Sequence, residues 1–162
     1  MRLYLEFDKL VRALLDARVK FAVAGGLAVG LHGFLRMTKD IDLLVREGEL
    51  EKIREILKCA GYRENSQQVN FQNSGLRLCR FWRRLPDMEE LLMVDVLVAE
   101  SAGTSRILRR ARPMRYANLK VPVVSRADLI EMKQLRGSKL DEADIEKLAK
   151  RRGQKKKTNH SR

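Results

Sequence analysis

Apolar residues recur along this chain in two patterns, one with helical spacing and one as short runs bounded by glycine, proline or polar residues. Helical spacing predicts amphipathic helices, whereas the short bounded runs predict strands. We expect helices over residues 3–19, 27–33, 49–60, 125–136 and 141–151, and strands over residues 21–24, 40–45, 69–71, 76–82 and 91–98. The pattern therefore predicts an α/β (α+β) protein, with a small mixed β-sheet and helices packed on it.

Polar and glycine residues mark several boundaries of these elements. Gly61 follows the helix over 49–60 and is expected to cap its C-terminus. Ser125 begins the helix that ends near residue 136 and is expected as its N-cap, with Asp128 in the third position of a capping box. The Asn-Ser-Gly sequence at residues 73–75 predicts a turn between two strands.

The segment over residues 21–45 combines a glycine pair with a carboxylate pair. It runs FAVAGGLAVGLHGFLRMTKDIDLLV, so one apolar run breaks at Gly25-Gly26 and a second contains Asp40 and Asp42. Because successive side chains of a strand point to opposite faces, both carboxylates project from one face. They repel each other unless a cation lies between them, and Mg²⁺ is usually held by one or two carboxylates plus substrate phosphates. Backbone N–H groups at a Gly-Gly turn can bind phosphate, so the segment predicts a nucleotide site.

A third carboxylate, Asp95, interrupts the apolar run LLMVDVLV over residues 91–98. A lone ionised aspartate in a buried strand costs several kcal/mol unless it is paired or bound to metal. One interpretation is a structural aspartate that backbone donors satisfy. The other is a third acidic ligand on a strand beside Asp40 and Asp42, which the presence of that pair favours.

The segment over residues 21–45 resembles the nucleotidyltransferase superfamily to which DNA polymerase beta belongs, in its minimal single-domain form. The closest likeness is to the AbiEii-type small nucleotidyltransferases. Gly25-Gly26 matches the turn after the first strand, Asp40 and Asp42 match the acidic pair, and the run RMTKDID over residues 36–42 is typical of the group. Many members carry a hydroxyl residue at or just after the second glycine, where this chain has Leu27.

A C-terminal pattern extends the resemblance over most of residues 20–150. The sequence DLIEMK, ending at Lys133, and the sequence KLDEADI over residues 139–145 are similar to the corresponding segment of the same small nucleotidyltransferases. The resemblance implies that Lys133 faces nucleotide phosphates, although lysine is also common on exposed helix surfaces. Asp141 and Asp144 are interpreted as an N-cap and as a solvated or lysine-paired acid.

The resemblance implies a nucleotidyltransferase fold and a complete set of site residues. Asp40, Asp42 and Asp95 would be catalytic residues and ligands of Mg²⁺ (or Mn²⁺), and the nucleotide would be bound by Gly25, Gly26, Arg36, Thr38 and Lys133. The implied activity moves a nucleoside monophosphate from a nucleoside triphosphate such as ATP to an acceptor hydroxyl. The acceptor is an RNA 3′ end, a protein or a small molecule, in a toxin–antitoxin or defence system.

Composition sets the domain organisation. The 162 residues fit one nucleotidyltransferase-like domain over 1–151, followed by a basic, disordered tail over 152–162. The formal charge is +13, and residues 150–162 hold seven Lys/Arg and no acid. Arginine clusters at 77–84 and 106–115 have two readings, a solvated face or contact with nucleic acid. No segment approaches the about 18 apolar residues of a membrane span, so the chain is expected to be cytoplasmic, with buried or half-buried free thiols at Cys59 and Cys79.

Rival classes fit the sequence less well. The glycines at 25–33 do not follow G-x-G-x-x-G, no P-loop motif is present, and His32 has no serine elbow motif for a hydrolase. The alternative that stays open is a catalytically weak or inactive nucleotidyltransferase-fold protein that binds nucleic acid or a partner protein. The basic clusters and Leu27 favour it, whereas the three retained carboxylates favour an enzyme.

Overall fold

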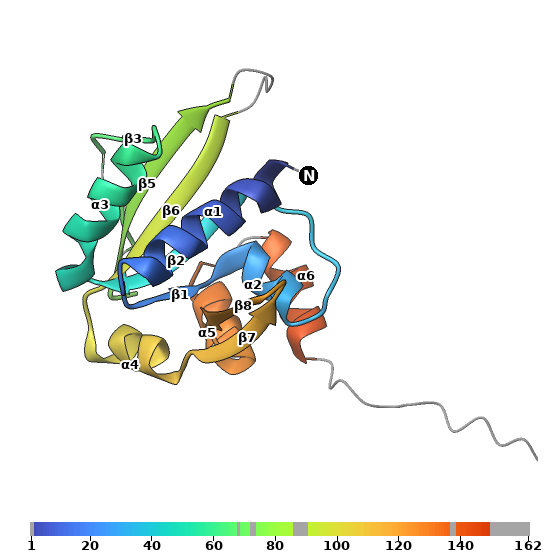
Figure 1. Cartoon of the computed structure of the whole chain (residues 1–162). Helices are drawn as coiled ribbons and strands as arrows, with labels where there is room; N and C mark the ends of the chain where they lie inside the picture. The colour runs from blue at the N-terminus through green and yellow to red at the C-terminus, as the bar shows by residue number, and fades with distance from the viewer. Residues whose placement is uncertain (1, 68, 72–73, 86–90, 137–138, 150–162) are drawn as a thin grey trace, which may run out of the picture.

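The computed structural model describes residues 2–67, 69–71, 74–85, 91–136 and 139–149, so the basic tail predicted over 152–162 lies outside the described residues. Within these ranges the chain forms six α-helices and eight strands (Figure 1). They are α1 (Arg2–Asp16), β1 (Phe21–Val23), α2 (Gly25–Leu31), β2 (Asp40–Arg46), α3 (Leu50–Cys59), β3 (Arg63–Glu64), β4 (Val69–Phe71), β5 (Leu76–Arg84), β6 (Leu91–Ala99), α4 (Ala102–Arg110), β7 (Arg112–Tyr116), β8 (Leu119–Val123), α5 (Arg126–Arg136) and α6 (Lys139–Ala149).

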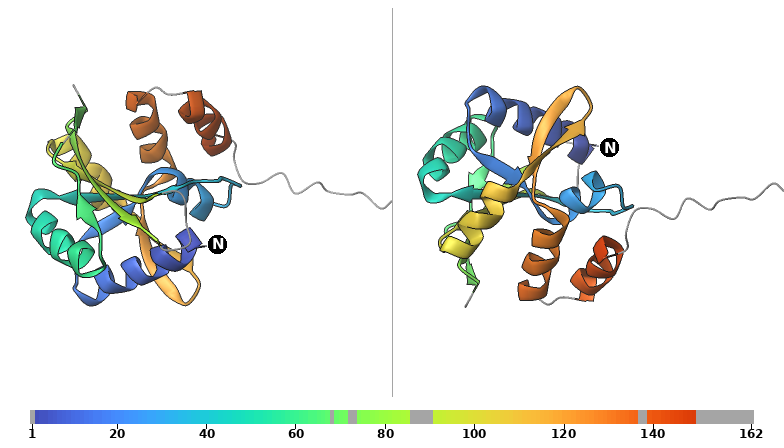
Figure 2. Two further views of the ribbon diagram at one scale, coloured as in Figure 1. Left: turned by 90° about the horizontal axis from the view of Figure 1, so that it is seen from above. Right: turned by 90° about the horizontal axis from the view of Figure 1, so that it is seen from below.

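All eight strands belong to one mixed sheet. Its order is β3-β5-β6-β2-β1-β8-β7, and β4 pairs with β5. The β2–β6 and β1–β8 pairs are parallel, and the other pairs are antiparallel. Figure 2 shows α1 and α3 on one side of the sheet and α5 and α6 on the other. This arrangement confirms the predicted fold class.

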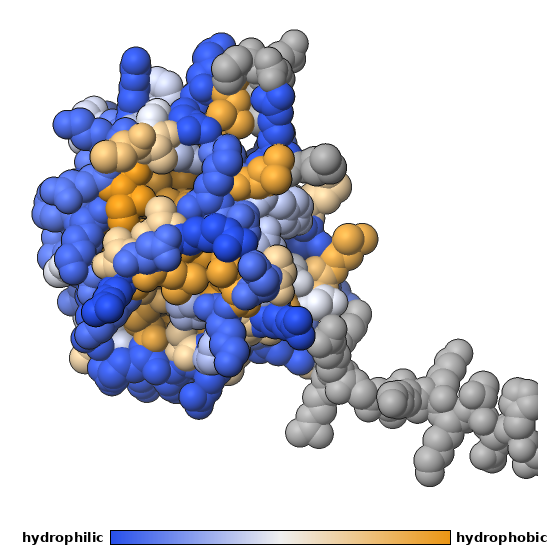
Figure 3. Space-filling model, viewed as in Figure 1, coloured by the Kyte–Doolittle hydropathy of each residue, from blue (hydrophilic) through white to orange (hydrophobic). Residues whose placement is uncertain are grey.

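The amphipathic pattern of the first helix determines how one face of the sheet is covered. Phe7, Leu10, Val11 and Leu14 recur at helical spacing in α1 and are buried. The Phe7 ring also meets the ring of Tyr116 edge to face, with centroids 5.0 Å apart. Figure 3 shows apolar side chains gathered over the middle of this side of the molecule, among polar side chains at its margin.

The predicted caps are present. Gly61 follows α3 with φ +83°, and the N–H groups of Gly61 and Tyr62 donate to carbonyls of the last turn of α3, which is a Schellman motif. The hydroxyl of Ser125 accepts a hydrogen bond from the Asp128 N–H at 3.2 Å, as expected for an N-cap.

The β7–β8 hairpin was not predicted. Pro113 and Pro122 face each other across its two strands, and proline within an apolar run normally argues against a strand. The hairpin avoids that cost because β7 is an edge strand, while β8 joins the sheet through a parallel bridge between Val23 and Val123.

Two further observations concern surface and solvent. Cys79 is buried as expected, but Cys59 is exposed, so the expectation of a buried or half-buried thiol is wrong for Cys59. Among the residues that the structure describes, no helix is both long and apolar enough to cross a bilayer.

Candidate active site

The three predicted carboxylates lie on one face of the sheet. Asp42 of β2 is the register partner of Asp95 of β6, so the two side chains leave neighbouring strands side by side. Asp40 lies two residues before Asp42 and therefore projects from the same face. Strands β2 and β6 are far apart in the sequence, and their parallel pairing brings Asp95 beside Asp40 and Asp42.

Asp95 is held by a cation that sequence reasoning did not select. Arg80 of β5 is the register partner of Asp95, and its Nε and Nη2 donate to the two carboxylate oxygens at 2.8 and 2.7 Å. Asp95 itself is 7% exposed. The hydrogen bond to Asp95 raises the pKa of the Arg80 guanidinium against the opposing effect of burial, and the charges of Asp40 and Asp42 add to the rise. The alternation along β5 places Arg80 on the acidic face, but its partner could not be read from the sequence.

Gly25 is the point where the backbone approaches an acidic side chain. It has φ +57°, a region that favours glycine, and a Cβ built on it would overlap the carboxylate of Asp42. The preceding N–H, that of Ala24, donates to the Asp42 carbonyl at 2.9 Å. The glycine therefore lets the first turn of α2 lie directly against Asp42.

Gly26 meets the loop that leads into β2. A Cβ on Gly26 would lie 2.8 Å from both Cβ and Oγ1 of Thr38, closer than real Cβ atoms approach a neighbour. Thr38 in turn donates from Oγ1 to the Asp40 carbonyl at 3.3 Å. Leu27, which replaces the hydroxyl residue of many nucleotidyltransferases, is buried in the core.

Lys133 is in a buried ion-pair cluster. It is 4% exposed, and its Nζ donates to Asp141 Oδ1 at 3.0 Å and to Asp144 Oδ2 at 2.8 Å. Arg36 Nε also donates to Asp144, at 3.1 Å. Burial raises the pKa of Asp144, but the hydrogen bonds from Lys133 and Arg36 outweigh it and the pKa is lowered. The surface-lysine interpretation is therefore wrong, and so is the prediction of Asp141 as an N-cap, since it lies inside α6.

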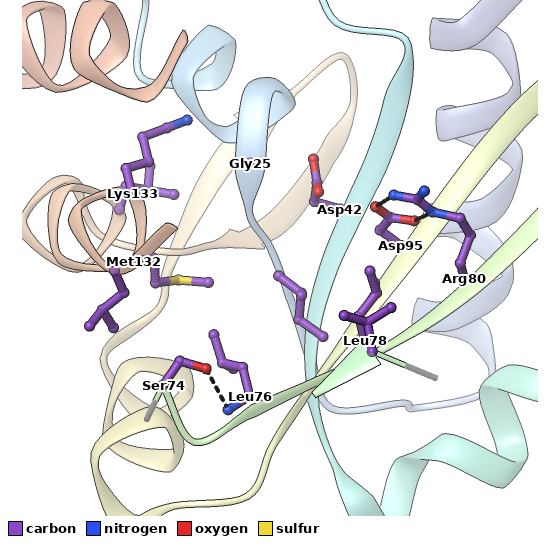
Figure 4. A pocket seen from close by; sticks show the side chains of 13 residues that line it. Gly25, Asp42, Ser74, Leu76, Leu78, Arg80, Asp95, Met132 and Lys133 are labelled. Carbon is purple, nitrogen blue, oxygen red and sulfur yellow. Dashed lines mark hydrogen bonds and ion pairs between the residues drawn. The ribbon is translucent and has the colours of Figure 1, made fainter. Parts of the chain in front are cut away.

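A cavity of about 280 Å³ joins several of these residues (Figure 4). Asp42 and the Asp95–Arg80 pair lie on one side of it and Lys133 and Met132 of α5 on the other, with Gly25 between them. The rest of its lining is Val69, Ser74, Leu76, Leu78, Leu97, Leu129 and Leu135. The predicted nucleotide contacts Gly26, Arg36 and Thr38, and the acid Asp40, are not among the residues that line it.

The carboxylates fit a magnesium ion as a pair rather than as a trio. In the described ranges, no three His, Cys, Asp or Glu side chains converge closely enough to hold a metal ion. Asp40 and Asp42 nevertheless offer hard oxygen donors on one face, and Mg²⁺ commonly takes one or two carboxylates and completes its shell with water and phosphate oxygens. Asp95 can join such a site only where Arg80 leaves one of its oxygens accessible.

Comparison with known proteins agrees with the resemblance of the sequence to nucleotidyltransferases. The family model for aminoglycoside-2″-adenylyltransferases matches residues 6–80, a stretch that contains Gly25, Asp40, Asp42 and Arg80 but ends before Asp95. A search of curated protein sequences finds no match to the chain. The finer grouping with AbiEii-type proteins stays a prediction.

Solved structures share most of the fold of this chain at low sequence identity. ANT(2″)-Ia in complex with adenylyl-2″-tobramycin is 15% identical with a TM-score of 0.62, over 91% of this chain and 87% of the other. The lincosamide antibiotic adenylyltransferase LnuA, lincomycin-bound, is 16% identical with a TM-score of 0.61, over 88% and 94%. A Thermotoga maritima protein, whose nucleotidyltransferase activity is itself an inference, is 18% identical with a TM-score of 0.59, over 87% and 88%. The chain therefore has the nucleotidyltransferase fold.

Proposed function

We propose that this chain is a metal-dependent nucleotidyltransferase, which moves a nucleoside monophosphate from a nucleoside triphosphate to an acceptor hydroxyl. The observation that carries the proposal is the contact of Gly25 with Asp42, whose register partner is Asp95. A backbone turn against one acid, with a second acid on the next strand, offers a phosphate site and a proton acceptor within one cavity. The match to an adenylyltransferase family model makes ATP the first donor to test.

The nucleotide would be bound on the Gly25 side of the cavity. N–H groups of Gly25 and Gly26 would donate to phosphate oxygens, and Asp40 and Asp42 would hold Mg²⁺ (or Mn²⁺). When bound, the ion would neutralise charge on the triphosphate and on the leaving pyrophosphate. Lys133 lines the same cavity, but its ammonium group is bound by Asp141 and Asp144, so it would reach a phosphate only by leaving them. Arg36 and Thr38 would position the loop that leads into β2 and Asp40.

The transfer itself would use Asp95 as the proton acceptor. The oxygen of the acceptor hydroxyl attacks the α-phosphorus, a new P–O bond forms, and the bond from the α-phosphorus to the oxygen bridging to the β-phosphate breaks. Pyrophosphate leaves, and the hydroxyl proton passes to the Asp95 carboxylate. The products are the nucleotidylated acceptor and pyrophosphate.

Arg80 would act as a positioning residue in this step. Its two donors engage both oxygens of Asp95, but each carboxylate oxygen has a second lone pair that can accept the acceptor hydroxyl. The bidentate pair fixes the carboxylate plane and thereby the direction from which a hydroxyl approaches. The same pair also engages both oxygens of Asp95, which is the observation that favours the alternative of a weak or inactive nucleotidyltransferase-fold protein that binds nucleic acid or a partner protein.

The test follows the α-phosphate. The full-length chain is incubated with Mg²⁺ and ATP labelled at the α-phosphate, together with RNA, protein or small-molecule fractions from cells, and parallel reactions carry the label at the γ-phosphate. The proposal expects α-label, and no γ-label, in one acceptor fraction, with release of pyrophosphate and loss of transfer in Asp42→Asn. Magnesium-dependent ATP binding without transfer to any fraction would favour the inactive alternative. A role in a toxin–antitoxin or defence system would be tested by growth arrest on expression, with Asp42→Asn as the control.

A further inference from the structure

A line of register partners crosses four strands on the acidic face of the sheet and leads away from the active site. Asp40 of β2 is the register partner of Met93 of β6, Met93 is the partner of Trp82 of β5, and Trp82 is the partner of Arg63 of β3. Register partners project from the same face, so this line runs from Asp40, a predicted metal ligand, to the edge of the sheet. Neighbouring strands are about 4.8 Å apart, which places Trp82 about 10 Å from Asp40.

The end of this line at the sheet edge contains an aromatic side chain and arginines. The guanidinium carbon of Arg63 lies 5.6 Å from the centre of the Trp82 ring. Arg84 and Arg80 flank Trp82 at two residues on either side along β5, and therefore share its face. Arg63 and Arg84 are exposed and Trp82 is half-buried. Together with Gly61 and Arg83, the three line a hollow of about 320 Å³ at this edge of the sheet. We call Arg63, Trp82 and Arg84 the arginine–tryptophan row.

These side chains match the chemistry of a single-stranded nucleic acid. Bases stack on aromatic rings whatever their sequence, and arginines bind the phosphates that connect them. We propose that the arginine–tryptophan row binds a single strand of RNA or DNA whose terminal hydroxyl reaches Asp95 as the acceptor, an inference that rests on the proposed transfer. Strand length is no obstacle, because a few nucleotides span the distance from Trp82 to the acids.

The row also disfavours the kind of acceptor bound by one structural neighbour. Tobramycin, which carries several ammonium groups, is the adenylylated compound in the ANT(2″)-Ia complex. In this chain the approach to the acids along β5 presents three arginines, Arg80, Arg84 and the adjacent Arg63, and like charges repel. A polyanion gains from the same charges through release of its counterions.

The binding test uses the full-length chain without nucleotide or metal. Trp82 is the one tryptophan of the sequence, so its fluorescence reports contact at the row itself. Fluorescently labelled single-stranded RNA and DNA oligonucleotides of equal length are titrated, and anisotropy is read together with tryptophan quenching. Inorganic polyphosphate serves as a polyanion that has no bases.

The variants separate stacking from general charge. Arg63→Gln and Trp82→Leu are compared with Arg115→Gln, which removes the same charge from exposed β7 at the opposite edge of the sheet. We expect oligonucleotide affinity to fall about tenfold or more in Trp82→Leu and to fall clearly in Arg63→Gln. It should change little in Arg115→Gln. Arg63 is exposed, so its variant remains informative if Trp82→Leu is unstable.

Each outcome decides for or against binding of a single strand at the arginine–tryptophan row. The proposal is supported if oligonucleotides quench the tryptophan fluorescence, polyphosphate does not, and the variants rank as expected. Comparison of the RNA and DNA titrations then shows which nucleic acid is bound. Absence of quenching, or equal losses in Arg63→Gln and Arg115→Gln, overturns it. Failure of the transfer reaction is a separate result, because Asp42→Asn should bind oligonucleotide like the parent. Transfer to a small molecule without oligonucleotide binding would overturn the row and leave the proposed function standing.

Discussion

The carboxylate of Asp95 accepts hydrogen bonds from both Nε and Nη2 of Arg80, its register partner on β5. Bidentate pairs of this kind are strong and fix the plane of the carboxylate. Asp95 is almost fully buried while Arg80 remains partly exposed, with 38% of its side chain accessible. The partly exposed Arg80 therefore supplies hydrogen bonds to the buried Asp95 carboxylate, which stays beside Asp42 in the cavity.

We expect Asp95→Asn to lower turnover far more than nucleotide affinity. An amide keeps the shape and one acceptor oxygen but cannot take the proton of the acceptor hydroxyl, and general bases typically contribute 10² to 10⁴-fold in rate, an order-of-magnitude range. Steady-state kinetics of the transfer and a separate titration of ATP binding would measure the two quantities. Equal losses in rate and affinity would recast Asp95 as a plain ligand of the bound nucleotide complex.

Gly25→Ala should destabilise the fold and abolish nucleotide binding. The new Cβ would overlap the Asp42 carboxylate, and the residue would also be held at φ +57°, so a loss of about 2 kcal/mol or more is expected. Gly30→Ala is the matched control, because a Cβ there meets nothing within 4 Å and alanine is favoured in a helix by up to about 1 kcal/mol. Thermal denaturation with and without Mg-ATP would show the contrast. Equal behaviour of the two variants would contradict the proposed role of the Gly25 turn.

The local part of the site could be predicted from the sequence. A glycine pair after an apolar run, and two carboxylates one residue apart, determine a turn and a shared face through short-range geometry alone. The strands that carry Asp40, Asp42 and Asp95 were predicted to within two residues at either end. The caps at Gly61 and Ser125 were predicted for the same reason, since each depends on neighbours within a few positions.

The partners of these residues could not be predicted, because they come from pairing between distant segments. The register of Asp42 with Asp95 spans 53 positions, and Arg80 reaches Asp95 through a second strand pair. Lys133 was assigned to phosphates on a pattern, yet its position between Asp141 and Asp144 depends on how α5 packs on α6. Propensity also failed at β7 and β8, because Pro113 lies on the edge strand β7 and Pro122 lies on β8 beside the bridge at Val123 that joins β8 to β1.

Asp40→Asn or Asp42→Asn should remove metal-dependent nucleotide binding and leave the apo fold as stable as the parent or slightly more stable. Each change removes one of two neighbouring negative charges, so repulsion in the apo protein falls while the metal loses a ligand. The shift of the melting temperature by Mg-ATP is the measurement. Asp16→Asn, at an exposed position at the end of α1, is the control and should keep the full shift. A variant at position 40 or 42 that still binds Mg-ATP like the parent would show that the metal assignment is wrong.

Lys133→Met should be strongly destabilising, because it leaves the buried carboxylates of Asp141 and Asp144 without their main cation. Breaking a buried ion pair by removing one partner costs about 3–5 kcal/mol. Lys52→Met, on the exposed side of α3, should change the free energy of unfolding by about 0.5 kcal/mol or less.

The loss in Lys133→Met should depend on pH in a definite direction. The pKa of Asp144 is lowered below its ordinary value of 3.8, so the stability gained from its partners is present above that value and disappears as the pH falls through the lowered pKa. Protonated carboxylates no longer need a cation, so the gap between parent and variant should be full near pH 7 and narrow below about pH 4. Urea unfolding at several pH values measures this gap. A variant as stable as the parent at pH 7 that fails to bind Mg-ATP would instead assign Lys133 to the phosphates.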